Sequence, residues 1–144
     1  MVSVAMKRIL PTVFTLDEVE TVLPLVEKMV LKLQVLDVAI ELLETVEMDI
    51  DEEDRAQVQY MVRFNKEFHQ LCYKYYRLAE KLELMGVVLQ DIEEGVVDFP
   101  HVYRGKKVML CWKMGEKRIT HWHETENVDA CYEERKKIVD LIVR

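Results

Sequence analysis

Hydrophobic residues in the first part of the chain recur every three or four positions, which is the period of an amphipathic helix. This stripe comprises Leu16, Val19, Leu23, Val26, Val30, Leu33, Leu36, Ile40 and Leu43. It follows Thr15, whose hydroxyl can accept a hydrogen bond from the amide of Glu18 while the Glu18 carboxylate accepts one from Thr15. Such a capping box marks a helix start. The pattern therefore predicts a long first helix that begins after Thr15.

A second stripe with the same period runs from Val58 to Met85 and stops at Gly86, the residue type best suited to a left-handed helix end. The acidic segment 49–54 separates the two stripes, and Asp51 within it is placed to cap the second helix. Residues 14–86 are therefore expected to form a long antiparallel helical hairpin.

The predicted hairpin is too long for the rest of the chain to cover. Helices of about 30 residues extend roughly 45 Å at 1.5 Å per residue. Further hydrophobic residues lie outside the main stripe of the first helix, namely Val22, Leu25, Met29, Leu31, Val35 and Val38. We therefore expect a coiled-coil hairpin that pairs with a second copy, as a homodimer built on a four-helix bundle.

After Gly86 the hydrophobic pattern changes from helical to alternating. Short apolar runs are separated by turns at Gly95, Gly105 and Gly115, which is the pattern of antiparallel strands joined by tight turns. We expect three or four short strands in a small antiparallel β-meander over residues 87–124.

Helical spacing returns near the end of the chain and predicts a C-terminal helix over residues 127–143. Residues 1–10 alternate loosely, which is consistent with a short strand or an arm. The fold class is thus α+β: a long antiparallel helical hairpin, then a small antiparallel β-meander, then a C-terminal helix. A chain of 144 residues is expected to form one domain.

The composition argues against two classes of binding partner, nucleic acids and membranes. The chain carries 27 acidic and 20 basic residues, a net charge of −7, which lacks the basic footprint of a nucleic-acid-binding protein. No apolar run approaches the roughly 20 residues of a membrane span. Three cysteines without a CxxC pair favour reduced thiols. We expect a cytoplasmic protein with no nucleic-acid or membrane partner.

Several motifs together resemble those of a known family. They are Phe14-Thr15-Leu16, Leu23-Pro24-Leu25-Val26, Gly86-Val87, Gly95-Val96-Val97-Asp98-Phe99-Pro100, Leu110-Cys111-Trp112-Lys113, Gly115-Glu116 and Trp122-His123-Glu124. In order and spacing this set resembles DUF2203, a family of short prokaryotic proteins of unknown function, over residues 14–124. Members of that family close with a Gly-Arg-rich tail. Here residues 125–144 take its place, with a possible counterpart at Arg135. The resemblance implies no particular reaction.

Two histidines are the first candidates for chemistry. His121 and His123 are two apart on a predicted strand, so both side chains lie on one face. Such a pair can bind a divalent metal, with further ligands from Asp98, Glu116 or Glu124. The alternative is structural, with one histidine exposed and the other hydrogen-bonded to a carboxylate. His121 does not belong to the family motif.

Four residues form a second candidate set for binding a small ligand, namely Asp98, Glu116, Trp122 and His123. Asp98 beside His123 could orient the imidazole and shift its pKa. Each also has a structural interpretation: Asp98 and Glu116 in turns, and Trp122 in sheet packing with Trp112. Cys111 is either a buried inert thiol or a nucleophile served by a histidine.

No catalytic motif is present, so the catalytic residues and cofactor stay unknown, with a divalent metal as the one cofactor considered. The leading hypothesis is a self-associating cytosolic protein with a polar and aromatic site on the β-meander for a ligand or partner. The alternative is a metal-assisted hydrolase in which His121 and His123 hold the metal and Asp98 or Glu116 acts as the base. Convergence of the four candidate residues on one cleft would favour a functional site.

Overall fold

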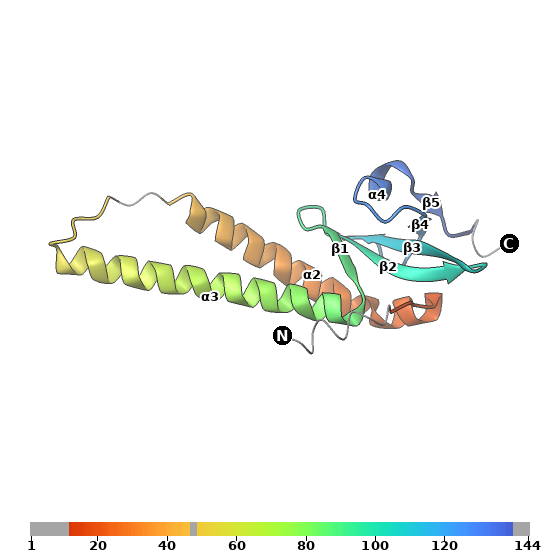
Figure 1. Cartoon of the computed structure of the whole chain (residues 1–144), viewed down its shortest axis with the longest axis horizontal. Helices are drawn as coiled ribbons and strands as arrows, with labels where there is room; N and C mark the ends of the chain where they lie inside the picture. Colours follow the sequence, from red (N-terminus) through yellow and green to blue (C-terminus); the bar gives the residue numbers. More distant parts are fainter. Residues whose placement is uncertain (1–11, 47–48, 140–144) are drawn as a thin grey trace.

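The computed structural model describes residues 12–46 and 49–139. Two long helices, α2 (Leu16–Glu44) and α3 (Arg55–Met85), form the expected hairpin (Figure 1). The capping box is present at the start of α2, since Thr15 and Glu18 exchange both predicted hydrogen bonds. The cap of α3 is Asp54, not Asp51, because the Asp54 carboxylate accepts hydrogen bonds from two amides of the first helical turn.

A five-stranded antiparallel sheet follows the hairpin. Its strands are β1 (Val88–Asp91), β2 (Val96–Tyr103), β3 (Lys106–Lys113), β4 (His121–His123) and β5 (Lys136–Lys137), and they lie in sequence order. The meander of the first four strands agrees with the prediction, and β5 adds a strand beyond the expected three or four. The α+β fold class is confirmed.

The predicted C-terminal helix is much shorter than expected in the described part of the chain. It is a single turn, α4 (Ala130–Glu133), after which Lys136 pairs with Trp122 of β4. The backbone amide of Ile138 also donates to Thr120. The open edge of β4 therefore competes with helix formation for these backbone groups. The remaining predicted helical residues, 140–143, and the predicted arm, 1–10, lie outside the described residues.

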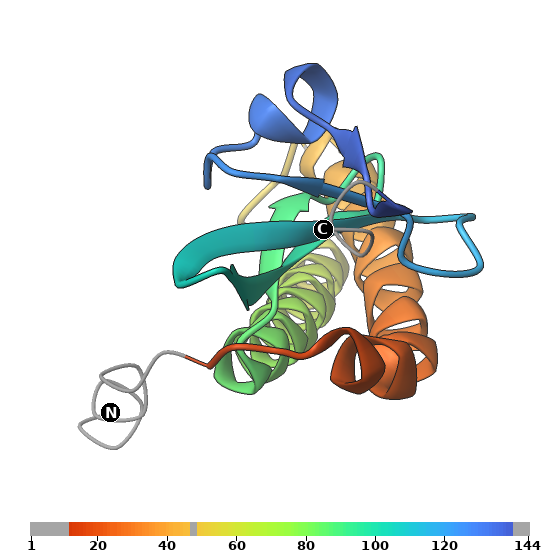
Figure 2. The same cartoon turned by 90° about the vertical axis from the view of Figure 1, so that its right-hand side faces the viewer.

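The hydrophobic core lies between one face of the sheet and the helices (Figure 2). Its sheet side includes Val97, Phe99, Leu110, Trp112 and Trp122, and its helix side includes Leu23, Val26, Val30 and Leu33 of α2. Both tryptophans therefore belong to this hydrophobic core. Figure 2 shows α4 and its flanking loops on the opposite face of the sheet. The molecule thus has three layers at this end.

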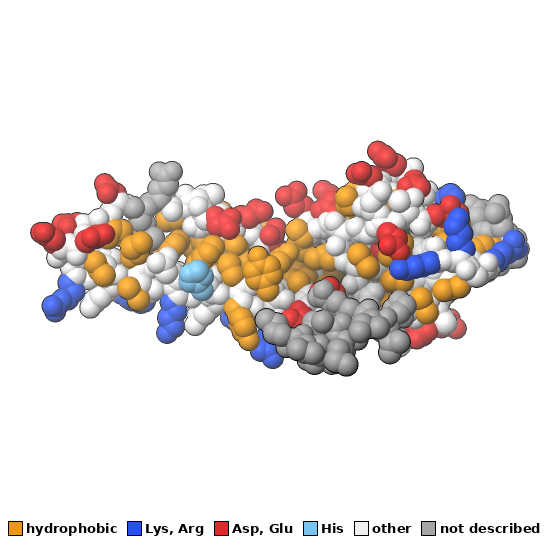
Figure 3. Space-filling model, in the orientation of Figure 1, with side chains coloured by type: hydrophobic (Ala, Val, Ile, Leu, Met, Phe, Trp, Pro, Cys, Tyr) orange, Lys and Arg blue, Asp and Glu red, His pale blue; other side chains and the backbone are white. Residues whose placement is uncertain are grey.

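The other end of the hairpin is built differently. Among the described residues between positions 37 and 81, none is buried. We call the segments 37–44 and 55–81 the distal hairpin. Hydrophobic side chains form a band along it that is open to solvent (Figure 3). Within the described residues, no helix combines the length and apolar character needed to cross a membrane.

Candidate metal centre

Strand register brings three polar side chains together on the face of the sheet that turns away from the helices. Asp98 of β2 lies opposite Cys111 of β3, and Cys111 lies opposite His121 of β4. His123 is two residues beyond His121, so strand alternation puts it on the same face. Asp98, Cys111 and His123 are each 0% exposed. This face therefore carries a buried polar cluster, which is costly unless its members are paired.

A fourth side chain, Cys131, reaches the cluster from α4. The turn before it is held by Asn127, whose side-chain oxygen accepts a hydrogen bond from the amide of Ala130 at 3.0 Å. The next residue anchors α4 to the sheet: the Tyr132 hydroxyl donates to Asp91 at 2.6 Å, and the ammonium of Lys113 lies 4.2 Å from the Tyr132 ring centroid. Cys131 is 0% exposed as a result.

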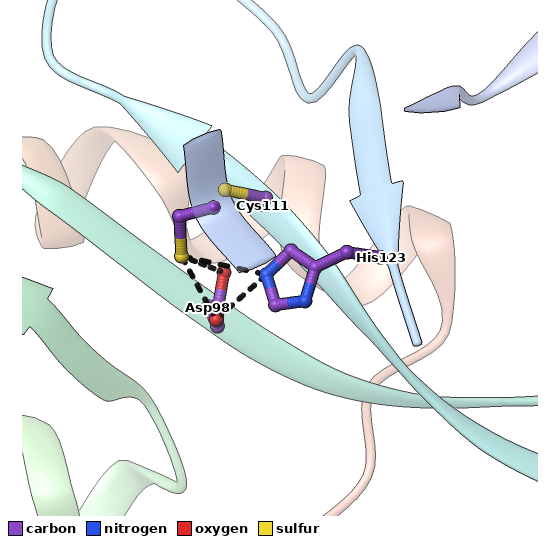
Figure 4. A group of neighbouring side chains, drawn as sticks. Asp98, Cys111 and His123 are labelled. Carbon is purple, nitrogen blue, oxygen red and sulfur yellow. Dashed lines mark hydrogen bonds and ion pairs between the residues drawn. The ribbon is translucent and has the colours of Figure 1, made fainter. Parts of the chain in front are cut away.

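The donor atoms of Asp98, Cys111, His123 and Cys131 all lie within 4.8 Å of one another (Figure 4). His123 Nε2 is 2.9 Å from Asp98 Oδ2 and 3.5 Å from Cys131 Sγ. Cys131 Sγ is also 3.5 Å from Asp98 Oδ2. Both partners of His123 thus approach the same ring nitrogen. We call these four residues the DCHC cluster.

The protonation of His123 can be inferred from the contact that its second ring nitrogen, Nδ1, makes. Nδ1 faces the carbonyl oxygen of Thr125, which can only accept, so Nδ1 carries a proton. Burial opposes a second proton, but hydrogen bonds to Asp98 and Cys111 outweigh it and raise the pKa of His123 to about 10. The imidazole is therefore fixed in orientation with Nε2 directed into the cluster, as is typical of metal-ligating histidines.

The two thiols behave differently. A hydrogen bond from Cys131 lowers the pKa of Cys111 to about 6 in spite of burial, with further help from His123. The same hydrogen bond to Cys111, together with burial, raises the pKa of Cys131. The pKa values of the two thiols are thus shifted in opposite directions, and Cys111 is the one that forms a thiolate more readily. A thiolate is both a nucleophile and a metal ligand.

A second layer of polar groups supports the DCHC cluster. The side-chain amide of Gln90 donates to Asp98 Oδ2 and to the carbonyl of Glu126, both at 2.8 Å. Arg135 donates to the carbonyl of Cys111 at 3.4 Å and to Glu116 at 2.9 Å. These contacts orient the carboxylate and place a positive charge beside the thiolate.

The arrangement does not match a cysteine–histidine–aspartate triad. A triad needs the acid on one ring nitrogen and the nucleophile on the other, whereas Asp98 and Cys131 share Nε2 of His123. A nucleophile must also reach a substrate, and both cysteines of the cluster are 0% exposed. Four donors that converge on one buried point instead resemble the ligand shell of a metal ion.

The distances among the donor atoms of Asp98, His123 and Cys131 are close to those of tetrahedral zinc. Bonds of about 2.3 Å to sulfur and about 2.0–2.1 Å to nitrogen or oxygen separate a sulfur ligand from a nitrogen or oxygen ligand by about 3.6 Å. The two such separations that involve Cys131 are each 3.5 Å. Nitrogen and oxygen ligands should be about 3.3 Å apart, and here they are 2.9 Å apart. These three residues would need shifts of a few tenths of an ångström to hold an ion, and Cys111 Sγ lies within 4.8 Å of their donor atoms.

The structure separates the residues that the sequence grouped as candidates. Asp98 and His123 lie together. His121 shares their face, but its Nδ1 lies 2.8 Å from the hydroxyl of Thr120 and 3.6 Å from Glu116, outside the DCHC cluster. Trp122 faces the hydrophobic core on the other side of the sheet. The four candidates therefore do not share one cleft.

Of the two remaining carboxylates, Glu116 lies close to the DCHC cluster and Glu124 faces solvent. Glu116 accepts from the amide of Lys113 and from Arg135, and these contacts lower its pKa although burial opposes them. His121 next to it has a lowered pKa because of burial and the nearby Arg135. Glu124 is exposed and pairs with Lys106. Glu116 is thus linked to Cys111 only through Arg135, which contacts both.

Sequence reasoning considered Cys111 only as an inert thiol or a nucleophile, not as a metal ligand, and it did not consider Cys131 as a site residue. The four residues of the DCHC cluster are separated by 12, 11 and seven intervening positions, so no short metal-binding motif exists. Strand alternation was the one available signal, since it puts Cys111 on the face opposite Trp112. Cys131 gave no comparable signal, because its position depends on how α4 docks on the sheet.

Comparison with known proteins identifies a family but no activity. A family model described as "Uncharacterized conserved protein (DUF2203)" matches residues 12–138. The match extends past the expected end at Glu124 and includes Arg135, so residues 125–138 of the C-terminal segment fall within it. No curated protein and no solved structure gives a significant match to the chain.

Proposed function

The chain belongs to the DUF2203 family, and we propose that this member is a zinc-binding protein whose single ion is held by Asp98, Cys111, His123 and Cys131. The observation that carries the proposal is the convergence of four donor atoms within 4.8 Å at a fully buried point. Two sulfurs, one imidazole and one carboxylate favour zinc over magnesium or calcium, which prefer oxygen ligands.

The charges around the DCHC cluster also support zinc as the bound ion. Zinc with two thiolates and one carboxylate leaves one net negative charge in a buried place, which needs compensation. Arg135 lies next to Cys111, and Gln90 donates to the Asp98 carboxylate. The thiolate ligands also require reducing conditions, so the proposal is made for a protein in the cytoplasm.

The role of the ion is structural in this proposal. Four protein ligands fill a tetrahedral shell, whereas a hydrolytic zinc site keeps one position open for water. Three ligands come from the sheet and the fourth comes from α4, so the ion would tie the C-terminal segment to the sheet. This reasoning disfavours the hydrolase hypothesis, which needs His121 as a ligand and an accessible base.

The direct test is the metal content of untagged protein, measured by mass spectrometry after dialysis with zinc. We expect one zinc per chain, and less than a tenth of that in Cys131→Ser and His123→Ala. Two matched controls should keep the full content: Cys72→Ser, in the hairpin, and His121→Ala, on the same strand face as His123. If zinc is lost in His121→Ala but kept in Cys131→Ser, the result would support the hydrolase alternative and refute the DCHC cluster as the metal site.

A further inference from the structure

The distal hairpin lacks the burial that normally holds two helices together. Of the 31 residues of α3, only Leu82 is buried, and it lies at the sheet end. In α2 the last buried residue is Leu36. Helical stability in proteins comes mostly from the packing of an apolar face, not from intrinsic propensity. Two helices with no buried residue along this length therefore have an incomplete core.

Part of the unburied apolar surface lies on one open face, although the exposed Val35 and Val38 of α2 do not line its groove. Val62, Tyr73 and Tyr76 of α3 recur with helical spacing, and they are 62%, 64% and 69% exposed. Beside them, a groove of about 290 Å³ runs between the helices and includes Ile40 of α2 and Tyr75 of α3 among its lining residues. A monomeric protein seldom exposes so continuous an apolar surface. We call this surface the open face.

Charge is divided between the two edges of the open face. The α2 edge carries Asp37, Glu41 and Glu44, and residues 33–44 of α2 contain no lysine or arginine. The α3 edge carries Lys66, His69 and Arg77. Figure 3 shows acidic side chains above the hydrophobic band of the distal hairpin and basic side chains below it. The open face is thus acidic on one side and basic on the other.

We propose that the open face binds the open face of a second copy of this chain, which completes a four-helix bundle. A twofold axis along the hairpin would lay α2 of each copy over α3 of its partner. The acidic edge of each copy would then meet the basic edge of the other, and the tyrosine-rich stripe on each α3 would pack on α2 of the partner. A face that is complementary to itself in this way is the requirement of a symmetric dimer.

The available area is that of a small specific interface. The α3 part of the distal hairpin, residues 55–81, extends about 40 Å, the α2 part, residues 37–44, extends about 12 Å, and each helix is about 10 Å wide. The face is therefore about 500 Å² per copy, or about 1,000 Å² in total, which is at the lower end of the range for specific interfaces. The bundle is independent of the metal proposal, because no residue of the DCHC cluster lies in the hairpin.

The test uses charge reversal on exposed residues, which leaves the core of each chain unchanged. One variant, Glu41→Lys with Glu44→Lys, makes both edges basic. The other, Lys66→Glu with Arg77→Glu, makes both edges acidic. Light scattering coupled to size-exclusion chromatography at micromolar concentration should give twice the 17.1 kDa chain mass for the unaltered protein. Each variant alone should dissociate at least about tenfold more readily, because like charges then meet.

Mixing the two variants gives the decisive result. We expect a heterodimer, since each basic edge then meets an acidic one, and no effect inside a single chain can produce this rescue. Val35→Glu is the matched control, because Val35 is 63% exposed on α2 but does not line the groove. It should leave the dimer intact, whereas Tyr76→Glu should dissociate it. A monomeric unaltered protein, a different oligomer, or variants that do not rescue each other would overturn the proposal.

Discussion

The two ends of the molecule differ in how they bury their hydrophobic residues. At the sheet end, both faces of the sheet are covered, and Trp112, Phe99 and the DCHC cluster are fully buried. At the distal end, the same two helices continue without a buried residue in the described part of the chain. One end is complete within a single chain, and in our proposal the other is completed by a second copy. Function should follow this division, with a closed metal centre at one end and an association surface at the other.

The largest expected effect is a difference in stability when one side chain from each end of the molecule is replaced by alanine. Trp112→Ala removes a fully buried indole and should lower the free energy of unfolding by about 3–5 kcal/mol. Tyr76→Ala removes a side chain that is 69% exposed, and in dilute monomer it should cost less than about 0.5 kcal/mol. Denaturant titration measures both. Equal losses would mean that the distal hairpin has a core of its own.

A second experiment examines the support of the metal centre. Gln90→Ala removes the amide that orients Asp98, and loss of such a contact typically weakens metal affinity about 10–100-fold. The affinity is measured by competition with a chromogenic zinc chelator. Gln70→Ala on exposed α3 is the matched control and should leave the affinity unchanged. If Gln90→Ala also has no effect, Asp98 is not oriented as a ligand.

The smallest expected effect concerns the start of α2 at the sheet end. Thr15→Ala removes the capping box and should cost about 1 kcal/mol of stability. Thr21→Ala is the control, because the Thr21 hydroxyl bonds only to the preceding turn of the same helix and alanine favours helix. Thermal unfolding of both variants gives the comparison. A cost for Thr21→Ala equal to that for Thr15→Ala would mean that the capping box adds no stability.

The hairpin and the meander could be predicted because both depend on local periodicity. The stripe from Leu16 to Leu43 and the turns at Gly95 and Gly105 specify helices and strands without knowledge of distant contacts. The predicted extent of the C-terminal helix was wrong, because the structure of this segment depends on a distant contact. Residues near Lys136 have helical spacing, but the free edge of β4 offers them backbone hydrogen bonds.

The candidate site could be predicted only in part. Alternation along the strands places Asp98 and His123 on the face opposite Trp122, and this was enough to separate polar from core positions. It could not show which cross-strand neighbours meet, because register depends on the folded sheet. The role of Cys131 depends on contacts of the following residue, Tyr132, with Asp91 and Lys113, which no spacing in the sequence indicates.

X-ray absorption spectroscopy at the zinc edge of the purified, zinc-loaded protein tests the central claim most directly. The account predicts a four-coordinate ion with two sulfur ligands at about 2.3 Å and two nitrogen or oxygen ligands at about 2.0–2.1 Å. Cys131→Ser should reduce the sulfur count to one or abolish binding, and Cys72→Ser should not change the spectrum. An ion surrounded only by nitrogen and oxygen, or a protein that takes up no zinc, would contradict the account.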